Sequence, residues 1–149
     1  MTTYTNVKIK RVGGRNHLPI PQYATSQSAG LDVMANIDEP ITLYHGVAEM
    51  IPTGFAVELH AGYEFQVRSR SGLSLKGITV ANSPGTIDAD YRGEIKVLLV
   101  NSSSMPFIIN GGDRIAQLVL ARVPQAIFEE VEELSDTVRG TGGFGSTGA

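Results

Sequence analysis

Apolar and polar side chains alternate along most of this chain with a period of two residues, which is the period of a β-strand. The alternation is clearest in residues 55–60 and resumes in residues 63–68 after a short turn, so these segments predict a β-hairpin. Residues 7–12 alternate more loosely and also predict a strand. Many short strands with frequent turns predict an all-β sandwich or barrel. Further apolar runs, separated by Gly, Pro, Asn and Ser, predict strands at residues 78–80, 95–100, 107–109 and 115–121.

One segment breaks this rhythm, and residues 71–77 predict a short helix. Ser69 or Ser71 is suited to cap its N-terminus, and the glycine at its end is suited to stop it. Arg68 and Arg70 precede the helix, so their guanidinium groups and the first backbone N–H groups could bind an anion together. The alternative, equally open at this point, is that both arginines are solvated charges at the end of a strand.

Residues 82–96 combine turn formers, acids and an apolar run in close succession. The turn formers come first, Asp88 and Asp90 follow, and Arg92-Gly93 leads into the apolar run. This order predicts a second β-hairpin, with two carboxylates near its bend. A polar tip on an apolar base could hold catalytic groups, although an acidic surface turn explains the same residues equally well.

Composition narrows the kind of partner that the chain could bind. The 149 residues fit one domain, and the net charge of −3 with a pI near 5.6 argues against binding to nucleic acid or to an anionic membrane. There is no Cys, and His17, His45 and His60 lack the close spacing of a metal pair. Because no signal segment and no bilayer-spanning apolar run is visible, we expect a soluble, cytoplasmic protein.

The composition changes near the C-terminus of this single domain, residues 1–149. Acidic residues at 129–133 predict a solvated strand face, and the following glycine-rich residues cannot form a core by themselves. We therefore expect a β-fold body, residues 1–138, and a flexible tail, residues 139–149. Three tail glycines have the spacing of a dinucleotide fingerprint, but no strand and helix surround them, so a Rossmann site is rejected. Arg139 could hold a phosphate and Phe144 could stack on a base, whereas the alternative is a disordered tail.

Five short segments, taken in order, span nearly the whole chain. They are Ala29-Gly30-Leu31-Asp32, Arg70-Ser71-Gly72-Leu73, residues 82–93, Gly112-Asp113-Arg114-Ile115-Ala116-Gln117, and residues 139–145. Together they resemble the five motifs of the homotrimeric deoxyuridine triphosphatases (dUTPases). The resemblance implies a jelly-roll β-sandwich and a homotrimer whose active sites are shared between subunits. It also implies Mg²⁺-assisted hydrolysis of dUTP to dUMP and pyrophosphate, which limits uracil incorporation into DNA and supplies dUMP for thymidylate synthesis.

The resemblance assigns the nucleoside side of the site to the third motif. Asp88 matches the catalytic carboxylate, which orients and deprotonates the water that attacks the α-phosphorus. Tyr91 matches the residue whose ring packs under the deoxyribose, where a 2′-hydroxyl would collide with it. Asp90 is expected to be a structural partner at the bend. Other matching residues would bind the uracil edge or contact the nucleotide, namely Asn82, Gly85, Thr86, Ile87 and Lys96.

The triphosphate side falls on the other motifs. Arg70-Ser71-Gly72 matches the phosphate-binding turn, with the serine hydroxyl near the oxygen that bridges the α- and β-phosphates. Gln117 matches a polar residue near the triphosphate. Asp32 resembles an acid that reaches Mg²⁺ through water, the metal being held mainly by the substrate phosphates. Asp113 and Arg114 are expected to form an ion pair near the subunit interface.

The C-terminal motif would act as a lid. Its matching residues would close over the nucleotide from a neighbouring subunit and exclude all water except the nucleophile. These residues are Arg139, Phe144, Gly145 and Ser146.

Two other functions remain open. A deoxycytidine triphosphate deaminase has the same fold, but its relatives use a glutamate in the pocket and lack a tail of this kind. A non-enzymatic trimeric β-sandwich that only binds a ligand would show no turnover.

Overall fold

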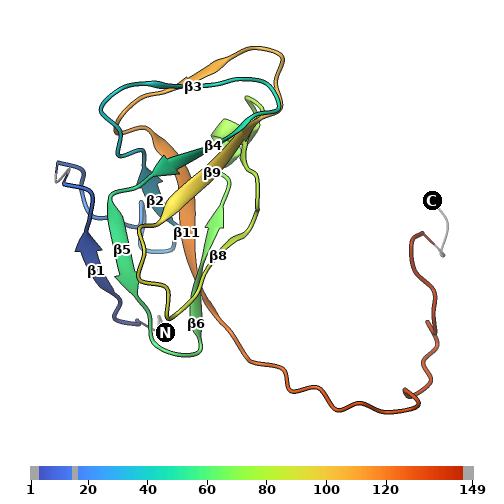
Figure 1. The fold of residues 1–149 in the computed structure, drawn as a ribbon. Helices are drawn as coiled ribbons and strands as arrows, with labels where there is room; N and C mark the ends of the chain where they lie inside the picture. The colour runs from blue at the N-terminus through green and yellow to red at the C-terminus, as the bar shows by residue number, and fades with distance from the viewer. Residues whose placement is uncertain (1–3, 15–16, 146–149) are drawn as a thin grey trace.

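The protein is built almost entirely from short β-strands, as the alternation predicts (Figure 1). The structure is a computed structural model, and it describes residues 4–14 and 17–145. Its elements in chain order are β1 (Lys8–Arg11), β2 (Leu31–Met34), β3 (Ile41–Leu43), β4 (Ala48–Pro52), β5 (Phe55–Glu58), β6 (Tyr63–Arg68), α1 (Ser71–Ser74), β7 (Ile78–Val80), β8 (Gly85–Ile87), β9 (Lys96–Asn101), β10 (Phe107–Ile109) and β11 (Arg114–Arg122).

Two antiparallel sheets form the body of the fold. One has four strands in the order β2-β11-β6-β8, and the other has three strands in the order β4-β9-β7. Two further antiparallel pairs, β1-β5 and β3-β10, complete it. The expected jelly-roll type of β-sandwich with one short helix is therefore confirmed.

One cluster of buried apolar side chains joins the two sheets. In the four-stranded sheet β6 contributes Phe65 and Val67, and in the three-stranded sheet β9 contributes Val97 and Leu99. These residues sit at alternate positions and are at most 4% exposed. Full burial of a side chain of this size contributes about 1.5–3 kcal/mol relative to exposure, so the shared core holds the two sheets together.

Both predicted hairpins are wrong, although their strands exist. β5 pairs with β1 and β6 pairs with β11 and β8, so residues 55–60 and 63–68 belong to different sheets. In the same way β8 pairs with β6, whereas β9 pairs with β4 and β7. Residues 88–95 therefore cross from one sheet to the other. Alternation reports that a strand has one buried face, but it carries no information on which strand lies beside it.

The short helix is confirmed, but it spans Ser71–Ser74 and is shorter than the predicted residues 71–77, and its start also differs. The N-cap residue is Arg70, which makes no side-chain capping bond, and the Ser69 hydroxyl instead accepts the backbone N–H of Val80 at 2.8 Å. Gly77 ends the turn as predicted, with φ of +80°, and donates its N–H to Ser74 O at 2.9 Å. The sequence patterns missed β3 and β4 altogether, because β3 has only three residues and β4 does not alternate strictly between apolar and polar residues.

The chain leaves the body after β11. Residues 123–145 form an extended arm that runs away from the two sheets (Figure 1). Residues 129–133 are exposed but contain no strand, so the predicted strand face is wrong. The proposed division between residues 138 and 139 stays a prediction. None of the helices within residues 4–14 and 17–145 has the length and hydropathy needed to cross a membrane.

A buried amide supplies a test of this fold. The side chain of Asn101 donates to Leu43 O and Met105 O at 2.9 and 2.8 Å, and it accepts from the backbone and hydroxyl of Ser103 at 2.9 and 2.8 Å. Asn101→Leu would leave these partners unpaired, at about 1–3 kcal/mol for each buried group. We expect the free energy of unfolding in urea to fall by about 2 kcal/mol or more.

Ser102→Ala is the matched control for this variant. The Ser102 hydroxyl is exposed and donates at 3.0 Å to Gly77 O, which keeps a second bond from the Ser102 backbone at 2.8 Å. We expect this change to stay within about 0.5 kcal/mol of the wild type. Equal losses in the two variants would contradict a structural role for the Asn101 amide.

Candidate active site

The crossing segment after β8 holds the acidic groove of the molecule. β8 buries Gly85 and Ile87 and exposes Thr86, and Asp88 follows at the first position beyond the strand. Asp88 lines a groove of about 450 Å³. The other residues that line this groove are Met50, Thr86, Ile87, Tyr91, Glu94 and Lys96.

Tyr91 lies in this groove in a fixed conformation. Its backbone N–H donates to Asp88 O at 3.2 Å, and its hydroxyl donates to Glu94 O at 3.0 Å. The ring lies so close to Gly93 that any Cβ at that position would overlap it. Tyr91 is nevertheless 44% exposed, so one part of the ring is available to a ligand.

Asp88 also lines a second groove, of about 600 Å³, on the side of Tyr63 and Asp90. A hydrogen bond with Thr5 lowers the pKa of the Tyr63 phenol from its ordinary value, and the nearby Arg122 guanidinium lowers it further. Asp88 therefore lies between two open grooves and is exposed, so water can reach its carboxylate.

Asn82 lies against β8. A Cβ built on Gly85 would lie 3.2 Å from Asn82 Nδ2 and 3.2 Å from Val67 Cβ. Glycine at this position therefore lets the Asn82 amide approach the strand backbone beside Thr86. The structure brings Asn82, Gly85, Thr86 and Ile87 together, and their contact with a uracil edge stays a prediction.

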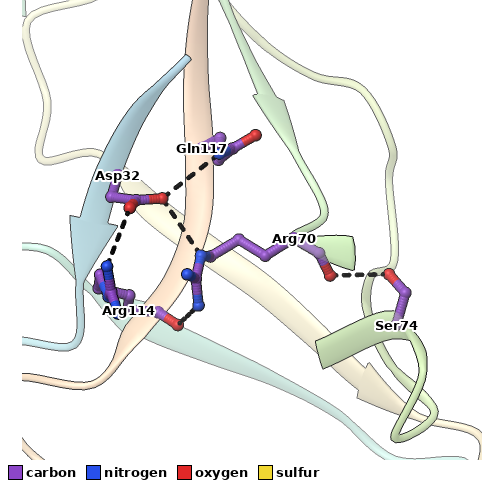
Figure 2. Close-up of polar contacts among 5 residues, drawn as sticks. All are labelled: Asp32, Arg70, Ser74, Arg114 and Gln117. Atoms are coloured by element: carbon purple, nitrogen blue, oxygen red, sulfur yellow. Dashed lines mark hydrogen bonds and ion pairs between the residues drawn. The ribbon is translucent and has the colours of Figure 1, made fainter. Parts of the chain in front are cut away.

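A charged cluster lies on the other edge of the four-stranded sheet (Figure 2). Asp32 Oδ1 accepts from Arg70 Nε at 3.2 Å and from Gln117 Nε2 at 3.4 Å, and Arg114 Nη1 lies 3.6 Å from Asp32 Oδ2. Arg70 Nη1 also donates to Arg114 O at 3.1 Å, and Arg70 O accepts from the Ser74 hydroxyl at 3.0 Å. Strand register creates this cluster, because Asp32 on β2 pairs with Gln117 on β11.

The expected ion pair between Asp113 and Arg114 is wrong. Asp113 Oδ2 accepts the backbone N–H of Asn110 at 2.8 Å and closes a turn, whereas Arg114 faces Asp32. Asp113 lies in the turn before β11 and its carboxylate closes that turn, so it is not directed at Arg114, the first residue of the strand.

Asp32 is the residue that the resemblance assigns to a water-mediated Mg²⁺ contact, and this role stays a prediction. Within residues 4–14 and 17–145 no group of three or more His, Cys, Asp or Glu side chains could hold a metal. Asp32 already accepts from Arg70 and Gln117 and lies beside Arg114, so two guanidinium groups surround its carboxylate. Such a carboxylate fits a contact to Mg²⁺ through water, with phosphate oxygens as the direct ligands.

The acidic groove and the charged cluster are separated within one chain. Phe65 on β6 pairs with Ile87, the residue before Asp88, whereas Arg70 follows the other end of β6. Five residues of extended chain, or about 16 Å, therefore separate these two positions. Ser71 and Gly72 start α1 on the side of the cluster, and the residues that line the grooves of Asp88 include neither of them. One chain therefore holds the groove of Asp88 and the charged cluster apart.

The predicted lid residues lie far out on the arm. Arg139 Nε donates to Gly142 O at 2.9 Å in a local turn, and Phe144 is fully exposed. Gly145 has φ of +83°, a conformation suited to glycine, and Ser146 lies outside the described residues. The sequence patterns missed Met50 and Glu94 in the groove, since neither belongs to a recognisable pattern before the fold is known.

Fold and site together define a β-sandwich protein with an exposed carboxylate beside an open groove and a cluster of guanidinium groups suited to an anionic ligand. A family model described as dUTPase matches residues 16–148. The deoxyuridine 5'-triphosphate nucleotidohydrolase of Rickettsia massiliae (strain Mtu5) is 53% identical over 147 residues, which are 98% of this chain and 99% of the relative. The chain therefore belongs to the dUTPase family, and the expected family and enzyme class are confirmed.

Solved structures agree with this assignment. A dUTPase variant of Staphylococcus bacteriophage 80alpha, solved with dUpNHpp, has a TM-score of 0.81 and 25% identity and covers 97% of this chain and 99% of its own. A dUTPase variant from phage phi11 of S. aureus, solved with a structural Mg(II) ion, has a TM-score of 0.77 and 23% identity. It covers 89% of this chain and 100% of its own, and it supports the fold alone.

The packing of Asn82 against Gly85 can be tested without a ligand. Gly85→Ala would force a methyl group against Asn82 and Val67, and overpacking of this kind costs about 1–3 kcal/mol. In an Asn82→Ala background the same substitution should cost measurably less, because one of its two steric partners is gone. Urea unfolding of the wild type, both single variants and the double variant gives the coupling energy. Additive costs would show that the two residues do not touch.

Proposed function

We propose that this protein hydrolyses dUTP to dUMP and pyrophosphate, with Asp88 as the group that activates water. The observation that carries the proposal is the place of Asp88 in a member of the dUTPase family, at the edge of an open groove beside Tyr91 and Lys96. Relatives at 53% and 52% identity are deoxyuridine 5'-triphosphate nucleotidohydrolases, which supports the same substrate here.

The reaction needs one base and one group that stabilises the leaving pyrophosphate. Asp88 would orient a water molecule and take its proton as the water oxygen bonds to the α-phosphorus. The bond from the α-phosphorus to the bridging oxygen breaks, and pyrophosphate leaves. The Ser71 hydroxyl would donate to that bridging oxygen as negative charge develops on it.

The nucleoside would bind in the groove of about 450 Å³. The uracil edge would meet the Asn82 amide and the backbone of residues 85–87, and the deoxyribose would rest on the Tyr91 ring. A 2′-hydroxyl would collide with this ring, and cytosine would leave buried donors and acceptors unpaired. Lys96 lines the same groove and would contact the nucleotide from the second sheet.

The triphosphate would be held by the charged cluster and the start of α1. Arg70, Ser71 and Gly72 would contact phosphate oxygens, with Gln117 beside them. Mg²⁺ bound to the phosphates would neutralise part of their charge. Asp32 keeps Arg70 oriented and would reach the metal through water.

A homotrimer with shared sites would bring the Asp88 groove of one chain to the charged cluster of another. About 16 Å of extended chain along β6 separates the position next to Asp88 from Arg70, so Asp88 and the cluster of one chain would not contact the same α-phosphate. The arm also exposes large apolar side chains that a second copy would cover, since Ile127, Phe128 and Leu134 are 98%, 95% and 87% exposed. Arg139, Phe144, Gly145 and Ser146 would then close a neighbour's site.

The same activity would limit uracil incorporation into DNA and supply dUMP for thymidylate synthesis. The absence of Cys and the net charge of −3 are compatible with a cytoplasmic enzyme that binds neither nucleic acid nor membranes.

The role of Asp88 is tested by Asp88→Asn. The amide keeps the size of the side chain but cannot take a proton from water, so kcat with dUTP and Mg²⁺ should fall at least about 100-fold. Binding of a non-hydrolysable dUTP analogue, measured by calorimetry, should change little. Undiminished turnover would overturn the assignment of Asp88 as the base.

The role of the arm is tested by removal of residues 139–149. The truncated protein should fold and assemble, because the deleted segment lies beyond the last strand, but it should lose most of its activity. Mixed oligomers of the truncated protein with the Asp88→Asn variant should recover activity, since an intact arm of one copy could close an intact Asp88 groove of another. Absence of recovery, with mixed assembly verified by mass, would refute shared sites.

A further inference from the structure

Glu94 makes a contact that none of the motifs explains. Its Oε1 atom accepts the backbone N–H of Gly54 at 2.9 Å, across 40 residues of sequence. Gly54 lies in the turn between β4 and β5 and is buried, so its N–H depends on a protein acceptor. The carboxylate of Glu94 is thus tied to the body of the fold, although it also lines the groove of Asp88.

The donor of this bond is held rigidly. Gly54 has φ of +78°, and a Cβ at this position would overlap the side chain of Asn36. Its carbonyl accepts the N–H of Val12 at 2.9 Å, which fixes the turn to the end of β1. The next residues reinforce the attachment, because Ile95 O accepts from the Thr53 hydroxyl at 2.6 Å and Ile95 N–H donates to Phe55 O at 2.8 Å.

Glu94 in turn holds Tyr91. The Tyr91 hydroxyl donates to Glu94 O at 3.0 Å, and the ring lies directly against Gly93. Arg92 Nη1 donates to Ala89 O at 2.7 Å and to Tyr91 O at 3.2 Å. These two bonds connect residues within the segment that carries Tyr91. The position of the Tyr91 ring is therefore set by a chain of contacts that starts at the Gly54 N–H and passes through Glu94.

We propose that Glu94 is a positioning residue. It fixes the position of the Tyr91 ring in the groove and thereby the discrimination between deoxyribose and ribose nucleotides. This inference rests on the proposed function, because it assigns the ring to the floor of the sugar pocket. The carboxylate itself does not contact the sugar. It holds residues 91–94 against the β4–β5 turn, so that the Tyr91 ring cannot move away from the sugar and leave space for a 2′-hydroxyl.

A purely structural role for Glu94 makes a different prediction. If the bond to Gly54 only stabilised the fold, its loss would lower the free energy of unfolding and reduce the activity on both nucleotides by the same factor. Positioning of the ring instead changes the ratio of the activities on UTP and dUTP, because only the ribose nucleotide carries the excluded hydroxyl.

The experiment compares Glu94→Ala with Glu94→Gln in steady-state kinetics on dUTP and UTP. The alanine variant lacks the acceptor for Gly54, whereas the glutamine carbonyl keeps it. We expect Glu94→Ala to raise the ratio of kcat/KM for UTP to kcat/KM for dUTP at least about 10-fold, mainly through KM, and Glu94→Gln to keep the ratio within about 3-fold of the wild type. Glu39→Ala, at an exposed carboxylate on the turn before β3, is the control for removal of a surface charge.

Each outcome decides between the two roles. An unchanged ratio in folded Glu94→Ala, checked by circular dichroism and thermal unfolding, overturns the inference, as does the same shift in Glu94→Gln. If Glu94→Ala does not fold, Tyr91→Phe removes the bond from the ring to Glu94 O, and an unchanged ratio in that variant has the same meaning. A wild type that does not hydrolyse dUTP refutes the proposed function itself, which separates the two failures.

Discussion

The passage of the chain from one sheet to the other after β8 is the constraint on which the acidic groove depends. Ile87 and Ile95 are both buried in the shared core, and the residues between them are partly or fully exposed. Because each isoleucine is anchored by burial, the seven residues from Asp88 to Glu94 must bridge the edge of the sandwich. A carboxylate on such a bridge is open to water and still held at both ends by the core.

The charged cluster depends on a different constraint, which is strand register. Pairing of β2 with β11 places Asp32 opposite Gln117, and pairing of β11 with β6 places Gln117 opposite Arg68, two residues before Arg70. Asp32 and Arg70 are partly buried, with side-chain exposures of 17% and 25%, so their ion pair is less screened than a surface pair. The guanidinium groups are therefore oriented before any anion arrives, which lowers the entropic cost of binding one.

These two constraints act at different places on the same four-stranded sheet, and they keep the groove and the charged cluster apart. A single chain carries a groove with a carboxylate, a cluster with guanidinium groups and an arm with exposed apolar side chains, and the residues of the cluster line neither groove of Asp88. The proposed assembly of several copies would give all three features a physical reason. Val12, which follows β1, donates to Gly54, and Gly54 donates to the Glu94 carboxylate. The Glu94 carbonyl accepts from Tyr91. The end of the first strand is therefore connected to the groove, although no residue of that strand lines it.

Local patterns in the sequence were sufficient for the strands at residues 78–80 and 107–109 and for the left-handed turn at Gly77, whereas the candidate residues around Asp88 were found through the family motifs and their roles stay predictions. Periodicity and turn chemistry are properties of neighbouring residues, so they can be recognised without the fold. Only the tertiary structure decided that β5 and β6 are not a hairpin, that Arg114 faces Asp32, and that Glu94 binds Gly54 across 40 residues. Such contacts depend on which buried faces meet in the core, and that choice is made by the whole chain.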